Sequence, residues 1–271
     1  MRLLTSLSIA IISAALAASA HASPDRVRFL EGASAATLTP EQQNETVKGY
    51  LTPGAVDITL VPAPPAIDSA QDKVDVAWLK GSIARANAER WAKAVADDAS
   101  VYDNFSEALG ATIDRQTLPR LVRLLNRVSE DALATTTEAK KRFSRPRPFQ
   151  RFALARVCGQ AKPPKPEASP TKGTSYPSGH AVVSWAAALV MMEAAPANAT
   201  PIVTRAVSYG ESRVVCGVHF PSDVESGRIL GAAVVDKLFT IPEFRRDLIC
   251  AKREVQAVMA GQKSEDLPAC Q

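Results

Sequence analysis

The segment from Ala181 to Ala195 constrains the fold more than any other, because it is apolar on almost every side. Ser184 and Glu193 are the polar residues that interrupt it. A helix without a polar face is stable only when other elements surround it, so it belongs in the middle of a bundle. The sequence therefore predicts an all-α fold built around this helix.

Helices are predicted upstream of this segment. Asp68 is expected to cap a helix that runs towards Val95 and is broken or bent near Gly81. Apolar residues at helical spacing over 118–128 predict a second helix, which runs towards Lys140. The apolar positions assigned to the first helix are Val74, Trp78, Ile83 and Trp91.

Two more helices are predicted downstream. Thr200 and Pro201 are expected to cap and begin one of them. Ser222 and Glu225 have the spacing of a capping box for the other. Because strand-like alternation is scarce, we expect one helical domain over residues 68–271.

Two segments are predicted to be irregular. Residues 23–67 contain one short helix signal, at residues 39–42, and then a proline-rich connector. Residues 159–173 are rich in proline and lysine, which favours a loop.

The first 22 residues have the pattern of a secretory signal peptide. Arg2 precedes an apolar run over residues 3–17, and small residues follow it up to Ala22. Such a run is too short to be a typical membrane span, and a small-x-small pattern is typical of a cleavage site. The sequence therefore predicts export and a periplasmic location, with His21 removed with the signal.

The rest of the chain indicates no nucleic-acid or membrane partner. The chain has 32 basic and 28 acidic residues, with no long run of either sign. Nucleic-acid binding normally requires a concentrated basic face or a recognised module. No later segment reaches the roughly 18 apolar residues that a membrane span needs.

Four cysteines follow the signal peptide, at positions 158, 216, 250 and 270. In an oxidising compartment they predict two disulfides, for which three connectivities exist. A metal site is disfavoured because no Cys-x-x-Cys pair is present. Our hypothesis pairs Cys158 with Cys216 and Cys250 with Cys270.

Three polar clusters fall where predicted helices begin or end. Each alone is a weak signal, since cations at a helix end usually face solvent and Pro-Ser-Gly usually marks a turn. The clusters are Lys140-x6-Arg147-Pro148, Pro177-Ser178-Gly179-His180 and Ser212-Arg213-x5-His219-x3-Asp223.

Together the clusters predict an anion site. Lys140, Arg147 and Arg213 supply positive charge, and arginine forks match phosphate oxygens in pairs. Ser178 and Gly179 precede the apolar helix, whose N-terminal N–H groups favour an oxyanion. The sequence therefore predicts that these five residues bind a phosphoryl group.

The two histidines of the mature chain, His180 and His219, provide the reactive groups. A neutral imidazole can attack phosphorus, and Asp223 is spaced to accept the proton on its other nitrogen. The second histidine can protonate the departing alcohol and then activate water. This division predicts a bell-shaped rate profile on the acid side of neutrality, with no metal or cofactor required.

These clusters resemble the signature of the phosphatidic acid phosphatase type 2 superfamily. The longer stretches "SYPSGHA" and "SRVVCGVHFPSDVESGRILG", the "PAPP" connector and "ERWAKAVADDAS" are similar to bacterial class A non-specific acid phosphatases, and the similarity covers about residues 50 to 239. The resemblance implies a secreted, helical phosphatase that acts on small-molecule phosphate monoesters and forms a homodimer or a larger assembly.

The resemblance also implies a role for each site residue. His219 would be the nucleophile, His180 the general acid and Asp223 the orienting partner. Thr174 and Ala181 depart from the family pattern, which usually has glycine and threonine there. Both departures are expected to lie outside the chemistry. The residues expected to hold the phosphoryl oxygens are Lys140, Arg147, Ser178, Gly179 and Arg213.

Other functions stay open at this point. A vanadium-dependent haloperoxidase or a lipid phosphate phosphatase shares the signature, and a phosphohistidine could also pass phosphate to another alcohol. A non-catalytic anion-binding protein would need the cations but not two histidines and an aspartate. The sequence does not specify the preferred phosphate ester.

Overall fold

The computed structural model describes residues 47–99, 101, 103–162, 164–167 and 173–270. These residues form nine α-helices and no strand, so the expected all-α fold is confirmed. The α-helices are α2 (Ala70–Arg85), α3 (Ala88–Ala99), α4 (Ser106–Leu109), α5 (Pro119–Arg142), α6 (Pro148–Arg151), α7 (Gly179–Ala194), α8 (Ala199–Val215), α9 (Pro221–Phe239) and α10 (Pro242–Met259). Short 3-10 turns lie at η2 (Ile58–Leu60), η3 (Asp103–Phe105), η4 (Pro196–Asn198) and η5 (Ser264–Asp266).

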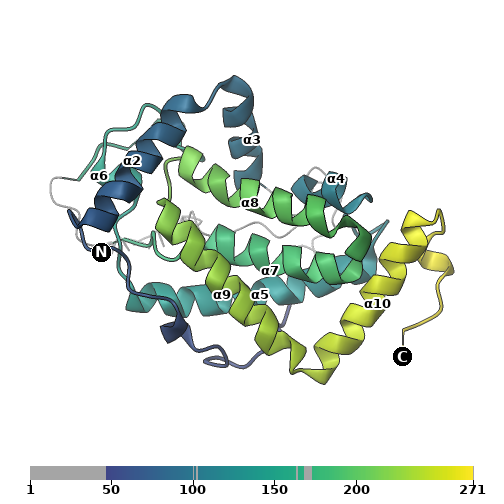
Figure 1. Cartoon of the computed structure of the whole chain (residues 1–271). Coiled ribbons are helices and arrows are strands. Elements are labelled where there is room, and N and C mark those ends of the chain that lie inside the picture. The colour runs from purple at the N-terminus through teal and green to yellow at the C-terminus, as the bar shows by residue number, and fades with distance from the viewer. Residues whose placement is uncertain (1–46, 100, 102, 163, 168–172, 271) are drawn as a thin grey trace, which may run out of the picture.

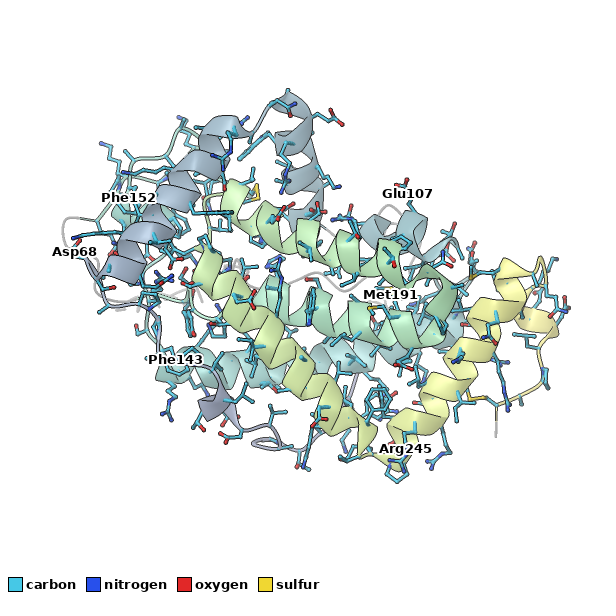
Figure 2. All side chains as sticks on the ribbon, in the orientation of Figure 1. Asp68, Glu107, Phe143, Phe152, Met191 and Arg245 are labelled. Carbon is cyan, nitrogen blue, oxygen red and sulfur yellow. A yellow bond between two sulfur atoms is a disulfide. The ribbon has the colours of Figure 1, made fainter. Side chains whose placement is uncertain are left out.

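Helix α7 occupies the centre of the bundle. It packs against α5, α8, α9 and α10, which run around it in Figure 1. Most of its side chains are buried, and Met191 lies inside the bundle in Figure 2. The apolar composition of this segment therefore has the expected cause, because neighbouring helices surround most of this helix.

Two glycines bring α9 unusually close to α7. A Cβ atom on Gly227 would lie 2.8 Å from both the Ala181 Cβ and the Ser178 carbonyl oxygen. A Cβ atom on Gly231 would lie 2.6 Å from the carbonyl oxygen of Val182. Because glycine alone permits this approach, the first turn of α7 packs directly against the second and third turns of α9.

The first predicted helix differs from the observed one in its start and its break. Asp68 has a left-handed φ of 65°, and Ser69 caps α2 instead, with its hydroxyl accepting from the Asp72 N–H. The helix continues through Gly81 and ends at Arg85, and Asn87 then caps α3. A glycine inside a helix costs only about 1 kcal/mol, which a packed helix tolerates.

The buried face of α2 also differs from the predicted one. Val74 and Trp78 are 57% and 61% exposed, whereas Asp72 and Asp75 are buried together with Leu79. Burying carboxylates requires cationic partners, which arginines from a distant segment supply, as described below.

Two other helix starts are shifted. Helix α8 begins at Ala199 with Asn198 as its N-cap, so Thr200 and Pro201 lie within its first turn. Helix α9 begins at Pro221, and the Asp223 carboxylate accepts from the Phe220 N–H at 2.8 Å. The predicted capping residue, Ser222, lies inside α9 because Asp223 caps the helix from its third position.

Several sequence predictions fall on the ends and loops of the chain. The predicted signal peptide and the helix signal at 39–42 lie outside the described residues. Of the predicted loop at 159–173, the part that the structure describes contains no helix. Among the described helices, none is long and apolar enough to cross a bilayer.

The structure pairs the four cysteines as Cys158–Cys216 and Cys250–Cys270, the connectivity that we expected. The first disulfide joins the segment after α6 to the end of α8, and the Cys158 N–H also donates to the Cys216 carbonyl oxygen. The second ties the C-terminal tail to α10.

Candidate active site

Three helix termini meet at one end of the bundle, beside α2 and α6 (Figure 1). They are the N-termini of α7 and α9 and the C-terminus of α8. The Ser178 N–H donates to the Asp223 carbonyl oxygen at 2.9 Å, and the Val218 N–H donates to the Arg213 carbonyl oxygen at 3.3 Å. The second and third sequence clusters are thereby joined through the backbone.

His219 lies at the centre of this end and is fully buried. Its Nδ1 atom is 2.8 Å from the carbonyl oxygen of Ser175 and 3.5 Å from Oδ2 of Asp223. Its Nε2 atom is 3.4 Å from Nη1 of Arg147. A carbonyl can only accept, so Nδ1 carries the proton and Nε2 presents its lone pair towards the cations.

Asp223 is held by several donors at once. Oδ1 accepts from Nη1 of Arg145 at 2.6 Å, and Oδ2 accepts from the Ser175 hydroxyl at 2.6 Å and from the Phe220 N–H. Burial raises the pKa of the Asp223 carboxyl, while the Arg145 charge and these hydrogen bonds oppose the rise. Asp223 thus lies beside His219 as predicted, but its strongest contacts are with other groups.

Arg145 is a site residue that the sequence analysis missed. Its Nη2 atom lies 2.8 Å from Oδ2 of Asp75 and 3.3 Å from Oδ1 of Asp72, and all of these side chains are buried. Arg151 forms a two-pronged pair with Asp72, both distances being 2.7 Å. A buried ionic network therefore connects α2 to Asp223 and so to His219.

Lys140 and Arg147 both contact Thr174. Lys140 Nζ donates to the Thr174 carbonyl oxygen, and Arg147 Nη2 lies 3.3 Å from the Thr174 hydroxyl. Thr174 therefore borders the candidate site, since its hydroxyl contacts Arg147, a predicted phosphate ligand. A glycine at this position would have no such hydroxyl.

Ser178 and Gly179 form the start of α7. The Ser178 hydroxyl caps the helix by accepting from the Ala181 N–H at 3.4 Å. A Cβ atom on Gly179 would lie 4.0 Å from Cε of Lys140, which places that lysine stem against the same turn. A helix N-terminus beside a lysine favours an anion.

His180 and Arg213 meet at another carboxylate, Asp98 of α3. Arg213 Nη2 lies 2.7 Å from Asp98 Oδ1, and His180 Nε2 lies 4.0 Å from the same oxygen. The His180 ring also stacks on Tyr209, with ring centroids 6.4 Å apart. No role was predicted for Asp98, although it lies in the stretch "ERWAKAVADDAS" that carries part of the family resemblance.

Comparison with known proteins indicates the family to which this arrangement of residues belongs. Residues 128–247 match the model of the PAP2 superfamily. A non-specific acid phosphatase of Providencia stuartii is 38% identical over 208 residues, which cover 74% of this chain and 81% of that protein. The chain belongs to the PAP2 superfamily. A non-specific acid phosphatase of Salmonella typhimurium is 35% identical (77% and 83% covered), and an acid phosphatase of Zymomonas mobilis is 33% identical (71% and 70% covered).

The PAP2 match contains all eight residues that the sequence predicted for catalysis and phosphate binding. It leaves out α2 and α3, and with them Asp72, Asp75 and Asp98. The supporting carboxylates of this PAP2 site thus come from a part of the chain that the superfamily model does not include.

The PAP2 site combines two imidazoles, several cations and a helix N-terminus. His219 presents Nε2 beside Arg147, and His180 lies on the first turn of α7 across from Arg213 and Asp98. Among the residues that the structure describes, no group of three or more His, Cys, Asp or Glu side chains is arranged to hold a metal ion. The arrangement can bind a phosphoryl group and supply both a nucleophile and a proton donor.

Proposed function

We propose that this protein is an acid phosphatase that hydrolyses phosphate monoesters through a phosphohistidine on His219. The observation that carries the proposal is the orientation of His219, whose Nδ1 faces the Ser175 carbonyl while Nε2 faces Arg147. This is the tautomer needed for attack by Nε2. The names of the relatives, non-specific acid phosphatase and acid phosphatase, support the same reaction.

In the first step, Nε2 of His219 attacks phosphorus and the bond to the ester oxygen breaks. The phosphoryl charge lies among the donors of Lys140, Arg147 and Arg213 and the first turn of α7. His180 gives its proton to the departing alcohol, so the leaving group is neutral. The developing positive charge on His219 is balanced by the nearby Asp223 carboxylate, 3.5 Å from Nδ1.

In the second step, water attacks the phosphohistidine. His180, now neutral, takes the proton from that water, and the bond between Nε2 and phosphorus breaks to release inorganic phosphate. An alcohol in place of water would accept the phosphoryl group, which gives a phosphotransferase side activity. The chemistry uses side-chain charges, and we propose that it needs no metal or cofactor.

The proposal extends to location and assembly. A signal peptide over residues 1–22 would carry the chain to the periplasm, where the two disulfides can form. The resemblance to class A acid phosphatases supports a homodimer or a larger assembly.

Turnover of a chromogenic aryl phosphate near pH 6, in excess EDTA, tests the reaction. We expect hydrolysis by the purified mature protein and none by His219→Ala. A phosphorylated species that is labile to acid and stable to base should be trapped from the native protein and be missing in the variant. Turnover that needs added metal, or that persists in His219→Ala, would contradict the mechanism.

A matched assay separates the alternatives. Oxidation of bromide by the vanadate-loaded protein, with no phosphatase turnover, would indicate a haloperoxidase. Turnover confined to phosphatidic acid in detergent would indicate a lipid phosphatase. Phosphate binding without any turnover would leave an anion-binding protein.

A further inference from the structure

Asp98 brings a negative charge into a site that is otherwise built to attract an anion. Its side chain is 24% exposed, while Arg213 and His180, which it contacts, are each 2% exposed. The contact with Arg213 is a direct ion pair at 2.7 Å. A carboxylate in this place costs affinity for a phosphate dianion, so its position calls for a physical reason.

Asp97, the residue before Asp98, determines the direction in which the Asp98 side chain points. Asp97 is fully buried, accepts from the Ser212 hydroxyl at 2.5 Å and forms an ion pair with Arg205. Both partners lie on α8, so Asp97 anchors α3 to that helix. With α3 held there, the next side chain along the helix reaches Arg213, also on α8.

The charges around His180 have opposite effects on its protonation. Arg213 on α8 and Lys140 on α5 are cations and disfavour the imidazolium form, and the Tyr209 ring from α8 covers one face. Asp223 at the start of α9 is paired with Arg145. The Asp98 carboxylate, 4.0 Å from Nε2, favours the charged ring that a general acid must be.

We propose that Asp98 is a positioning residue with two linked tasks. It holds the Arg213 guanidinium in the empty site and yields it to the phosphoryl oxygens, and it supports the protonated form of His180 that donates to the leaving group. The second task rests on the proposed phosphatase reaction. The first requires only that the site binds phosphate.

Asp98→Asn tests both tasks, because asparagine keeps the shape and removes the charge. Inorganic phosphate should bind more tightly, with a Ki lowered by about tenfold, since one partly screened competing charge is lost. For an alkyl ester such as glycerol phosphate, kcat should fall by about tenfold, because a poor leaving group needs the general acid. For nitrophenyl phosphate, whose leaving group needs little protonation, kcat should change by less than about threefold.

Two variants serve as controls. Glu89→Gln removes the same charge from an exposed position nine residues earlier in α3, about 13 Å along the helix, and should behave like the native protein. Asp98→Glu keeps the carboxylate and should restore most of the alkyl kcat. Thermal unfolding of each variant establishes that it is folded.

The outcomes are distinguishable. If Asp98→Asn weakens phosphate binding and lowers both kcat values equally, Asp98 is a structural clamp and the proposal is wrong. An unchanged Ki for phosphate, together with an unchanged ratio of the kcat for glycerol phosphate to that for nitrophenyl phosphate, would also overturn it. If the native protein shows no turnover, the phosphatase reaction fails, yet calorimetric titration of Asp98→Asn with phosphate still decides the first task.

Discussion

The carbonyl oxygen of Ser175 lies 0.7 Å closer to His219 Nδ1 than the Asp223 carboxylate does, at 2.8 Å against 3.5 Å. The backbone therefore sets the tautomer of His219. Asp223 acts on His219 through its charge and through the Ser175 hydroxyl, which it holds at 2.6 Å. From the sequence, the tautomer was assigned to Asp223, because a backbone carbonyl has no signature in a sequence.

Asp223→Asn should lower kcat by about 100-fold, the effect of losing a supporting partner beyond the reactive group. A loss of about 10⁴ is typical where the carboxylate alone sets the tautomer. We expect the smaller loss because the Ser175 carbonyl stays in place. Steady-state kinetics with an aryl phosphate measure this, and a loss near 10⁴ in a folded variant would assign the tautomer to Asp223.

Arg145→Met should destabilise the protein by about 3–5 kcal/mol, since it leaves buried carboxylates without their shared cation. The affected groups are Asp72, Asp75 and Asp223. Urea unfolding at pH 7 measures the change. Lys263→Met, which removes an exposed ion pair with Glu265, is the control and should leave the midpoint unchanged. Equal midpoints for the two variants would show that the buried network contributes nothing.

The pH dependence of stability should include a contribution from Asp72. Burial acts to raise the pKa of its carboxyl, but hydrogen bonds from Arg151 and from the Asp68 N–H, together with the Arg151 charge, lower it below the ordinary value. A lowered pKa stabilises the fold above the unfolded-state value, about 3.9, and this stabilisation is lost as pH falls through the folded-state pKa.

Asp72→Asn should therefore destabilise the protein at pH 7, and its difference from the native protein should shrink below about pH 4. Denaturant unfolding at pH 7, 5 and 3 measures that difference. A gap of the same size at pH 3 and pH 7 would mean that the ionisation of Asp72 plays no part.

Thr174→Val should strengthen phosphate binding by about fivefold, because the Thr174 hydroxyl no longer shares the donors of Arg147 and one hydrogen bond is worth about 1 kcal/mol. Inhibition by inorganic phosphate measures the effect. Thr174→Ser keeps the hydroxyl and should match the native Ki. Weaker binding in the valine variant alone would mean that the hydroxyl orients Arg147 for phosphate.

Composition and helical spacing were sufficient to predict the all-α bundle and the central place of α7. That helix is apolar all round, so only a surrounded position fits it. The site clusters could also be located, because each lies at a helix terminus where glycine, proline and charge are concentrated. The roles of their residues in turnover stay predictions until the variants are measured.

The orientation of α2 could not be predicted. Its apolar positions Val74 and Trp78 are exposed, and Asp72 and Asp75 are buried against Arg145, which lies 73 and 70 residues later in the chain. Local periodicity places charged residues outside, and the opposite result depends on a partner that periodicity does not include. For the same reason no role could be predicted for Asp98, because its ion pair is with Arg213 on another helix.

The buried position of α7 has a consequence for how the protein loses activity. Ser178, Gly179 and His180 stand at the start of a helix that four others enclose. Local fluctuations open exposed elements first, and a fully enclosed helix is released only when the whole fold comes apart. The start of α7 therefore persists while exposed elements open locally, and it is lost only in the cooperative transition that unfolds the whole bundle.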